Sequence, residues 1–261
     1  MRVRILGCGG SGGVPLVGGL WGNCDPNEPK NRRRRASILI EHGTTAILVD
    51  TSPDLREQLL DSGTRHLDAV LFTHAHADHL HGIDDLRSMN RLMRAPIPVH
   101  ANRETLDQIG ERFGYVFRPL EDGASFYKPT LTPHAIDGTF DIAGIRIVPF
   151  AQDHGFTTTL GFRIGGLGYS TDVVALDEAA FAALAGVDLW IVDCLRYEPH
   201  PTHSHLARTL DWIARVKPRR AVLTHMDVPL DYATLRRELP AGVEPGYDGL
   251  TIEVIEGPAS N

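Results

Sequence analysis

A chain of 261 residues with 42% hydrophobic and 23% charged residues has an ordinary globular composition and can bury a core without disulfide staples. Its net charge of −7 argues against a protein whose main task is to coat nucleic acid, although bound cations would still attract a phosphate ligand. Three dispersed cysteines, and no apolar run of signal-peptide or membrane-span length, favour a cytoplasmic protein with reduced thiols.

Short apolar runs of strand length recur along the chain, each bounded by Gly, Pro, Asp or His. They cover Val3–Leu6, Ser37–Ile40, Ala46–Val49, Ala69–Phe72, Ile145–Phe150, Thr159–Ile164, Leu189–Val192 and Ala221–Leu223. Helical patterns cover Pro53–Leu60, with Ser52 as N-cap, and Leu176–Leu184 and Leu206–Val216. This order predicts a layered α/β protein with helices flanking a two-sheet core. No linker or repeat interrupts it, so we expect a single domain over residues 1–261.

One long irregular stretch, Gly7–Asn31, follows the first predicted strand and is dense in Gly, Pro and Asn. A loop of this length in a compact domain is usually functional. The basic run Arg32–Arg35 comes next, and it has two interpretations: a solvated edge before a strand, or a rim that attracts anions.

Four side chains of metal-binding type lie within six residues, directly after the predicted strand Ala69–Phe72. His74 and His76 alternate, so in extended geometry they project to one side, whereas Asp78 and His79 are adjacent and can diverge toward a second ion. Four ligands from one loop exceed what a single tetrahedral ion easily takes. The pattern therefore predicts two ions rather than a chance cluster of surface histidines.

Three further ligand types stand where predicted strands end, namely His154, Asp172 and His225. Because the carboxyl ends of strands in α/β folds converge on the ligand site, we expect these side chains to meet the His-rich loop. Our hypothesis has two ligand groups that share a bridging Asp172. The first ion is held by His74, His76 and His154, and the second by Asp78, His79 and His225. Nitrogen and oxygen donors without thiolate favour zinc, with manganese or iron as alternatives.

Three aspartates are candidates for hydrogen bonds to the ligand histidines on the side away from the metal. Asp50 and Asp193 end strand-like runs, and Asp248 lies in a tyrosine–glycine turn. A carboxylate in such a position fixes the ring orientation of a metal-binding histidine.

The H-x-H-x-D-H run at residues 74–79, followed in order by a later His, Asp and His, resembles the metallo-β-lactamase superfamily over essentially the whole chain. The resemblance implies an αββα four-layer sandwich with the metal site at one edge of the two sheets, and the seven residues above as its ligands. Four segments look more specifically like the phosphodiesterases that open phosphoribosyl cyclic phosphate in phosphonate breakdown. They are Gly7–Pro15, Ile97–Val99, Leu223–His225 and Gly246–Gly249.

In those phosphodiesterases a histidine that opens a late helix acts beside the metals, and His203 matches its place. The tRNA 3′-end nucleases of the superfamily carry a similar His-Ser pair. The residues alone leave His200 and His205 as alternatives to His203. The phosphodiesterases also hold a structural zinc in a cysteine cluster, where this chain has Cys24 alone, so we expect no structural zinc there.

We therefore predict a dinuclear metal-dependent hydrolase, and most specifically a phosphodiesterase of small cyclic phosphates or nucleotides that uses a metal-bridging hydroxide. The predicted catalytic residues are Asp78, as a ligand, and His203, as proton donor to a phosphate oxygen or the leaving alkoxide. Two alternatives stay open: a thioester, lactone or amide hydrolase of the same fold, and a non-catalytic metal- and nucleotide-binding protein of cofactor biosynthesis. We expect no membrane or extended nucleic-acid partner, and the resemblance implies a homodimer.

Overall fold

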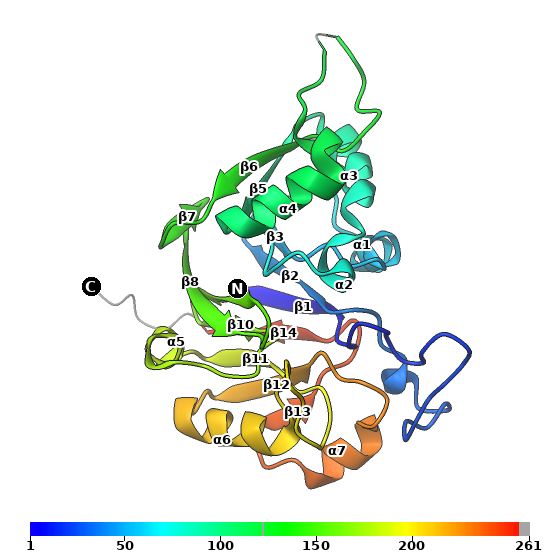
Figure 1. Cartoon of the computed structure of the whole chain (residues 1–261), viewed down its shortest axis with the longest axis vertical. Coiled ribbons are helices and arrows are strands. Elements are labelled where there is room, and N and C mark those ends of the chain that lie inside the picture. The colour runs from blue at the N-terminus through cyan, green and yellow to red at the C-terminus, as the bar shows by residue number, and fades with distance from the viewer. Residues whose placement is uncertain (122, 256–261) are drawn as a thin grey trace.

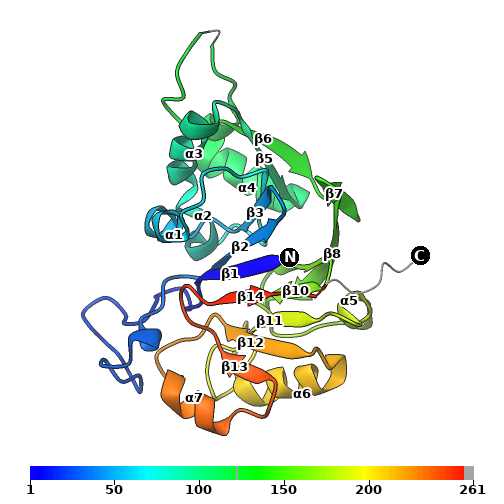
Figure 2. The same cartoon turned by 180° about the vertical axis from the view of Figure 1, so that it is seen from behind.

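The computed structural model describes residues 1–121 and 123–255. The last residues of the predicted domain, 256–261, therefore lie outside the described residues. Within them, two seven-stranded sheets pack face to face (Figures 1 and 2). The first sheet has the order β14 (Thr251–Glu253), β1 (Arg2–Gly7), β2 (Ser37–His42), β3 (Thr45–Val49), β4 (Ala69–Leu71), β5 (Ile97–Ala101), β6 (Leu131–Ala135). The second has the order β13 (Val243–Pro245), β12 (Arg220–Thr224), β11 (Leu189–Asp193), β10 (Leu167–Ser170), β9 (Thr158–Ile164), β8 (Ile145–Asp153), β7 (Phe140–Ile142).

Helices cover the outer face of each sheet, which completes the expected αββα sandwich (Figure 1). Those of the first sheet are α1 (Leu55–Ser62), α2 (Ala77–Leu80), α3 (Leu86–Met93) and α4 (Arg103–Phe113). Those of the second are α5 (Glu178–Leu184), α6 (Leu206–Val216) and α7 (Tyr232–Glu238). Short 3₁₀ turns occur at Pro29–Asn31, Ile83–Asp85 and Gly114–Phe117. No helix in the described part of the chain is long and apolar enough to cross a membrane.

Alternating side chains of the central strands contribute to two separate apolar cores. In β2, Ile38 and Ile40 join the core between the sheets, whereas Leu39 joins the core under helices α1, α3 and α4. Both faces of the strand are covered, so its sequence is continuously apolar and does not alternate between apolar and polar residues. This is why the predicted strands could be found as short apolar segments, and each of them overlaps a strand of the structure.

The helix predicted to follow Ser52 begins later than expected. Helix α1 starts at Leu55 with Asp54 as its N-cap, so Ser52 is not the cap and Pro53 lies outside the helix. Ser52 is fully buried and donates its hydroxyl to Gln58 Oε1 at 2.9 Å. The preceding residue, Thr51, donates its N–H to His79 O at 2.8 Å. The chain is thus tied to the His-rich loop before it can turn into the helix.

Strand direction brings the ends of both sheets to one edge. Strands β3 and β4 are parallel, as are β10, β11 and β12. Strand β8 runs with β10, because both are antiparallel to β9. The carboxyl ends of these strands carry the residues that the sequence marks as ligands.

Buried Arg33 anchors the glycine-rich loop to the second half of the chain. Its Nη2 donates to Leu230 O at 2.6 Å and to Asn31 Oδ1 at 3.3 Å. Its Nη1 donates to Asp227 O at 3.5 Å and lies 3.9 Å from the buried Cys24 Sγ. Cys24 therefore packs beside a guanidinium that links two distant loops.

Replacing Arg33 by Met should lower the free energy of unfolding by about 3 kcal/mol, because buried acceptors lose charge-assisted hydrogen bonds. Urea unfolding of Arg33→Met and of the neighbouring Arg32→Met measures this difference. Arg32 is exposed and lies over the Trp21 ring, so its variant is the control. Equal stability of the two variants would contradict the anchoring role.

Candidate metal centre

The His-rich loop leaves β4 in extended form and then turns once into a short helix. His76 has extended backbone angles and is the N-cap of α2, so His74 and His76 precede the helix, whereas Asp78 and His79 lie on it. Four side chains from six residues can therefore point in two directions.

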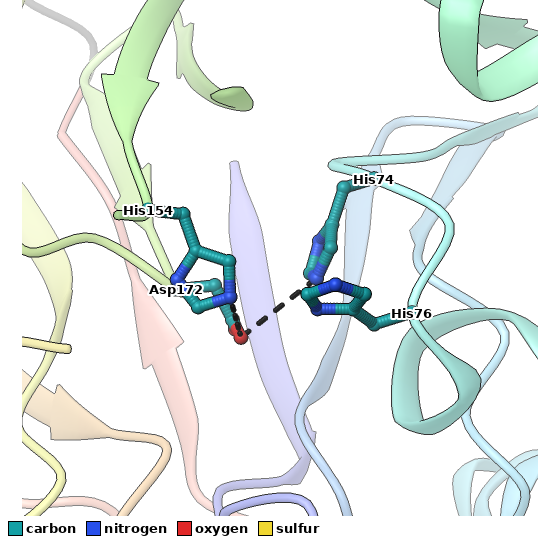
Figure 3. Close-up of side chains that lie close together, drawn as sticks. All are labelled: His74, His76, His154 and Asp172. Carbon is teal, nitrogen blue, oxygen red and sulfur yellow. Dashed lines mark ion pairs between the residues drawn. The ribbon is translucent and has the colours of Figure 1, made fainter. Parts of the chain in front are cut away.

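Three side chains of the second sheet meet this loop. His154 follows β8 and His225 follows β12 directly, while Asp172 lies two residues beyond the end of β10. Figure 3 shows His154 and Asp172 facing His74 and His76 from the other side of the site. All seven predicted ligands thus lie at one edge of the sandwich.

The carboxylate of Asp172 stands between two groups of side chains. Its Oδ1 lies 3.8 Å from His74 Nε2 and 3.6 Å from His154 Nε2. Its Oδ2 lies 3.0 Å from His79 Nε2 and 3.4 Å from His225 Nε2. The two oxygens therefore face different histidine pairs, which is the arrangement a bridging carboxylate requires.

Each pair is completed by one more side chain. His76 joins the first, with its ring 4.4 Å from that of His74 and 5.2 Å from that of His154. Asp78 joins the second, because its Oδ2 lies 3.3 Å from His79 Nε2 and 3.4 Å from His225 Nε2. In each group, with Asp172 included, the candidate ligand atoms lie within 4.8 Å of one another. His76 is exposed, so the first group is the one open to solvent.

Fully buried Asp50 supports one histidine of each group. Its Oδ2 accepts from His79 Nδ1 at 2.7 Å and from Thr73 Oγ1 at 2.8 Å. Since the Thr73 hydroxyl donates to Asp50, it accepts from His74 Nδ1, which lies 3.0 Å away. Both rings therefore carry their proton on Nδ1 and present Nε2 to the site.

His154 is held in the same way, because its Nδ1 donates to Thr202 O at 2.7 Å. The Nε2 atoms of His74 and His79 are buried and have no hydrogen-bond partner among the described residues. Buried nitrogen lone pairs that converge with carboxylates fit cations, and this donor set suits a divalent metal.

The carboxylates govern the charge of the second group. Burial lowers the pKa of His79, but Asp172, Asp78 and Asp50 outweigh it and hold that pKa well above the usual range. His225 is also buried, and Asp172 and Asp78 nevertheless raise its pKa to about 9. By contrast, burial keeps the pKa of His74 well below the ordinary value. The second group therefore attracts positive charge.

Three residues of the site have left-handed backbone angles, which are strained for residues other than glycine. Their φ values are 64° for Asp50, 55° for Asp172 and 56° for His225. Each follows the end of a strand, where the chain turns sharply and aims the side chain along the sheet edge. Such strain at three converging residues is typical of a functional site.

Of the three candidate histidines His200, His203 and His205, only His203 faces the cavity beside the candidate ligands. Its Nδ1 lies 3.1 Å from Asp193 Oδ2, and its Nε2 lies 3.8 Å from Asp172 Oδ1. It lines a cavity of about 480 Å³ together with residues of both ligand groups, and His200 and His205 do not. One correction concerns its position: α6 begins at Leu206 with His205 as N-cap, so His203 precedes the helix rather than opening it.

Of the three candidate supporting aspartates, Asp50 holds His79, and Asp193 holds His203 rather than one of the seven ligands. Asp248 was expected to do the same, but it accepts hydrogen bonds from Arg34 N at 2.8 Å and from Cys8 N at 3.3 Å. It therefore supports the base of the glycine-rich loop. Burial raises the pKa of this carboxyl to about 7.

Known proteins resemble this chain at two levels. A curated relative named octanoyltransferase, from Porphyromonas gingivalis (strain ATCC BAA-308 / W83), is 35% identical over 257 residues, which cover 96% of this chain and 51% of the relative. A ribonuclease Z from Bradyrhizobium sp. (strain ORS 278) is 33% identical over 139 residues, 52% of this chain and 45% of that protein. The chain thus spans about half the length of these curated relatives.

Among solved structures, the crystal structure of a new diphosphatase from the PhnP family is similar over 98% of both chains, with a TM-score of 0.88 and 32% sequence identity. Residues 45–226 match the family model described as the beta-lactamase superfamily domain, and this segment contains all seven ligand candidates. The sandwich, the order of these residues and the family match agree, and the chain belongs to the beta-lactamase superfamily.

Proposed function

We propose that this protein is a hydrolase of small phosphodiesters that works with two divalent metal ions. The observation that carries the proposal is the division of the Asp172 oxygens between two histidine groups, with the His203–Asp193 pair beside them. One similar protein is named a diphosphatase and another a ribonuclease, which supports a reaction at phosphorus.

The proposed ligands of the first ion are His74, His76 and His154, those of the second are Asp78, His79 and His225, and Asp172 serves both. Zinc suits these donors best, with manganese or iron as alternatives. When bound, such ions lower the pKa of a water toward neutrality and hold phosphate oxygens.

The side chains beyond the ligands supply the proton and the shape of the site. Asp193 fixes the ring of His203 through Nδ1, so that Nε2 faces the cavity. A proton on that nitrogen can pass to the alkoxide that leaves when the P–O ester bond breaks. The cavity of about 480 Å³ falls within the range typical of small-molecule pockets, which favours a small substrate over a polymer.

Hydrolysis of a thioester is a second candidate, favoured by the relative named octanoyltransferase, of which this chain covers 51%. A thiolate leaves without a proton, so this reaction would not need His203. The proton donor therefore distinguishes the two reactions.

Three predictions test this proposal, and the first concerns the shared ligand. Wild-type protein should bind about two ions per chain, and Asp172→Ala should reduce the occupancy of both because each group loses a carboxylate oxygen. Elemental analysis after gel filtration measures the ratio, with Asp211→Ala, an exposed carboxylate on α6, as control. Loss of only one ion in Asp172→Ala would contradict the bridging role.

The second prediction concerns Asp50. In Asp50→Asn, an amide replaces an oxygen that accepts from both Thr73 and His79, so metal affinity should fall about 10–100-fold. Competition with a chromogenic chelator measures it. Asp248→Asn is the control, since Asp248 is half-buried and accepts hydrogen bonds away from the candidate ligands. Equal affinities in the two variants would show that Asp50 does not orient the ligands.

The third prediction concerns His203. His203→Ala should keep both ions but lower kcat by about 10²–10⁴-fold on a phosphodiester with an alkoxide leaving group, as expected for loss of a general acid. The loss should shrink for p-nitrophenolate, which leaves with little need for a proton. His200→Ala and His205→Ala should be milder. Similar small losses in all three variants would remove the proton-donor role, and a loss of equal size on both leaving groups would make His203 a phosphate-binding residue.

A further inference from the structure

A second cavity, of about 590 Å³, lies away from the metal edge and shares no lining residue with the first. It is bounded by β1, the C-terminal end of α1, the segment that leads into β14, and the basic run after the glycine-rich loop. Four of its lining side chains are cations, namely Arg4, Lys30, Arg32 and Arg34. Among the described residues, two carboxylates also line it, those of Asp61 and Asp248. In a chain of net charge −7, this cavity therefore holds a local excess of positive charge.

The side chains of the basic run Arg32–Arg35 alternate in role, as neighbours on an extended segment do. Arg33 is buried, and Arg35 pairs with the N-cap aspartate of α1 at 3.2 Å, so both have partners within the fold. Arg32 and Arg34 instead line the cavity. For these two residues, the arrangement supports the interpretation of the run as a rim that attracts anions.

Two of the cations contact only neutral groups. Arg4 Nη1 donates to Ser62 O at 2.8 Å, and Arg4 Nε is buried without a hydrogen-bond partner among the described residues. Lys30 Nζ donates to the Tyr232 hydroxyl at 3.1 Å and lies 4.3 Å from the centre of the Tyr247 ring. Carbonyl groups, hydroxyl groups and aromatic rings carry no net charge, so both positive charges remain uncompensated.

The other two cations are also available to a ligand. The Arg32 guanidinium lies 5.2 Å from the centre of the Trp21 ring, which is neutral. Arg34 Nη1 lies 2.6 Å from Asp61 Oδ2, but the Asp61 side chain is 64% exposed, and such a surface ion pair contributes little energy. Asp248 accepts from Arg34 N at 2.8 Å, and burial raises its pKa to about 7, so it is only partly ionised at neutral pH. An anion in the cavity would therefore meet more positive than negative charge.

We propose that this second cavity binds a small molecule with two linked phosphate groups, held by Arg4, Arg32 and Arg34. Four cations against two carboxylates leave at least two positive charges uncompensated, which matches a diphosphate better than a single phosphate group. Arginine suits this ligand because its planar guanidinium donates paired hydrogen bonds to phosphate oxygens. The site only binds, since none of the described residues that line it offers an imidazole or a thiol for chemistry.

Calorimetry of the metal-loaded full chain with pyrophosphate measures the dissociation constant. Arg32→Met and Arg34→Met should each raise it about tenfold, because each removes a charge-assisted contact. Arg2→Met is the matched control, since Arg2 is an exposed arginine of β1 outside the cavity lining, and it should leave the constant unchanged. Asp61→Asn should lower the dissociation constant about threefold, because a carboxylate that competes for Arg34 is removed. Loss of the fold could not produce this tighter binding.

The metal edge also attracts phosphate, so one further comparison separates the two sites. Part of the pyrophosphate binding should survive Asp172→Ala and disappear in the double variant Arg32→Met/Arg34→Met. The metal content is measured before and after each titration, because pyrophosphate itself binds divalent ions. Binding that is unchanged in the double variant, or that is lost entirely in Asp172→Ala, would overturn the proposal, whether or not the protein hydrolyses phosphodiesters.

The number of phosphate groups is tested with two further ligands. Inorganic phosphate should bind about tenfold more weakly than pyrophosphate, and equal dissociation constants would overturn the assignment of a diphosphate. ADP presents the same diphosphate group on a nucleoside. Binding of ADP more tightly than pyrophosphate would support an organic diphosphate as the ligand, and weaker binding of ADP would support free pyrophosphate.

Discussion

The carboxylate of Asp172 is the contact through which the two sheets form one site. Oδ1 faces His74 and His154, and Oδ2 faces His79 and His225. This position depends on the left-handed backbone of Asp172, two residues beyond the end of β10. The proposal of two metal ions therefore depends on Asp172 as the residue that both candidate ligand groups share.

Asp50 gives that arrangement its rigidity from the opposite sheet. One buried carboxylate fixes His79 directly and His74 through the Thr73 hydroxyl, so a histidine of each group depends on it. A cation would also offset the charge of Asp78 and Asp172, which raise the pKa of His79 and His225 against the effect of burial. The folded chain therefore positions the nitrogens and supplies the negative charge that together favour divalent metal.

The ligand groups could be predicted from the sequence because short-range spacing and strand ends determine them. The H-x-H-x-D-H run identified four candidate ligands. The position of His154, Asp172 and His225 directly after apolar runs indicated that they lie at the same edge of the sheets. The sequence could not identify the partners of Asp50 and Asp248, because those partners come from distant segments and only the packed structure brings Thr73 and His79 to Asp50. The start of α1 was missed for a similar reason, since the bond from Thr51 to His79 delays the helix.

Anomalous X-ray diffraction at the zinc edge, from crystals of the zinc-loaded wild-type protein, tests the central claim most directly. The account predicts two peaks on either side of the Asp172 carboxylate, one beside His74, His76 and His154 and the other beside Asp78, His79 and His225. A single peak, or two peaks that Asp172 does not separate, would contradict it.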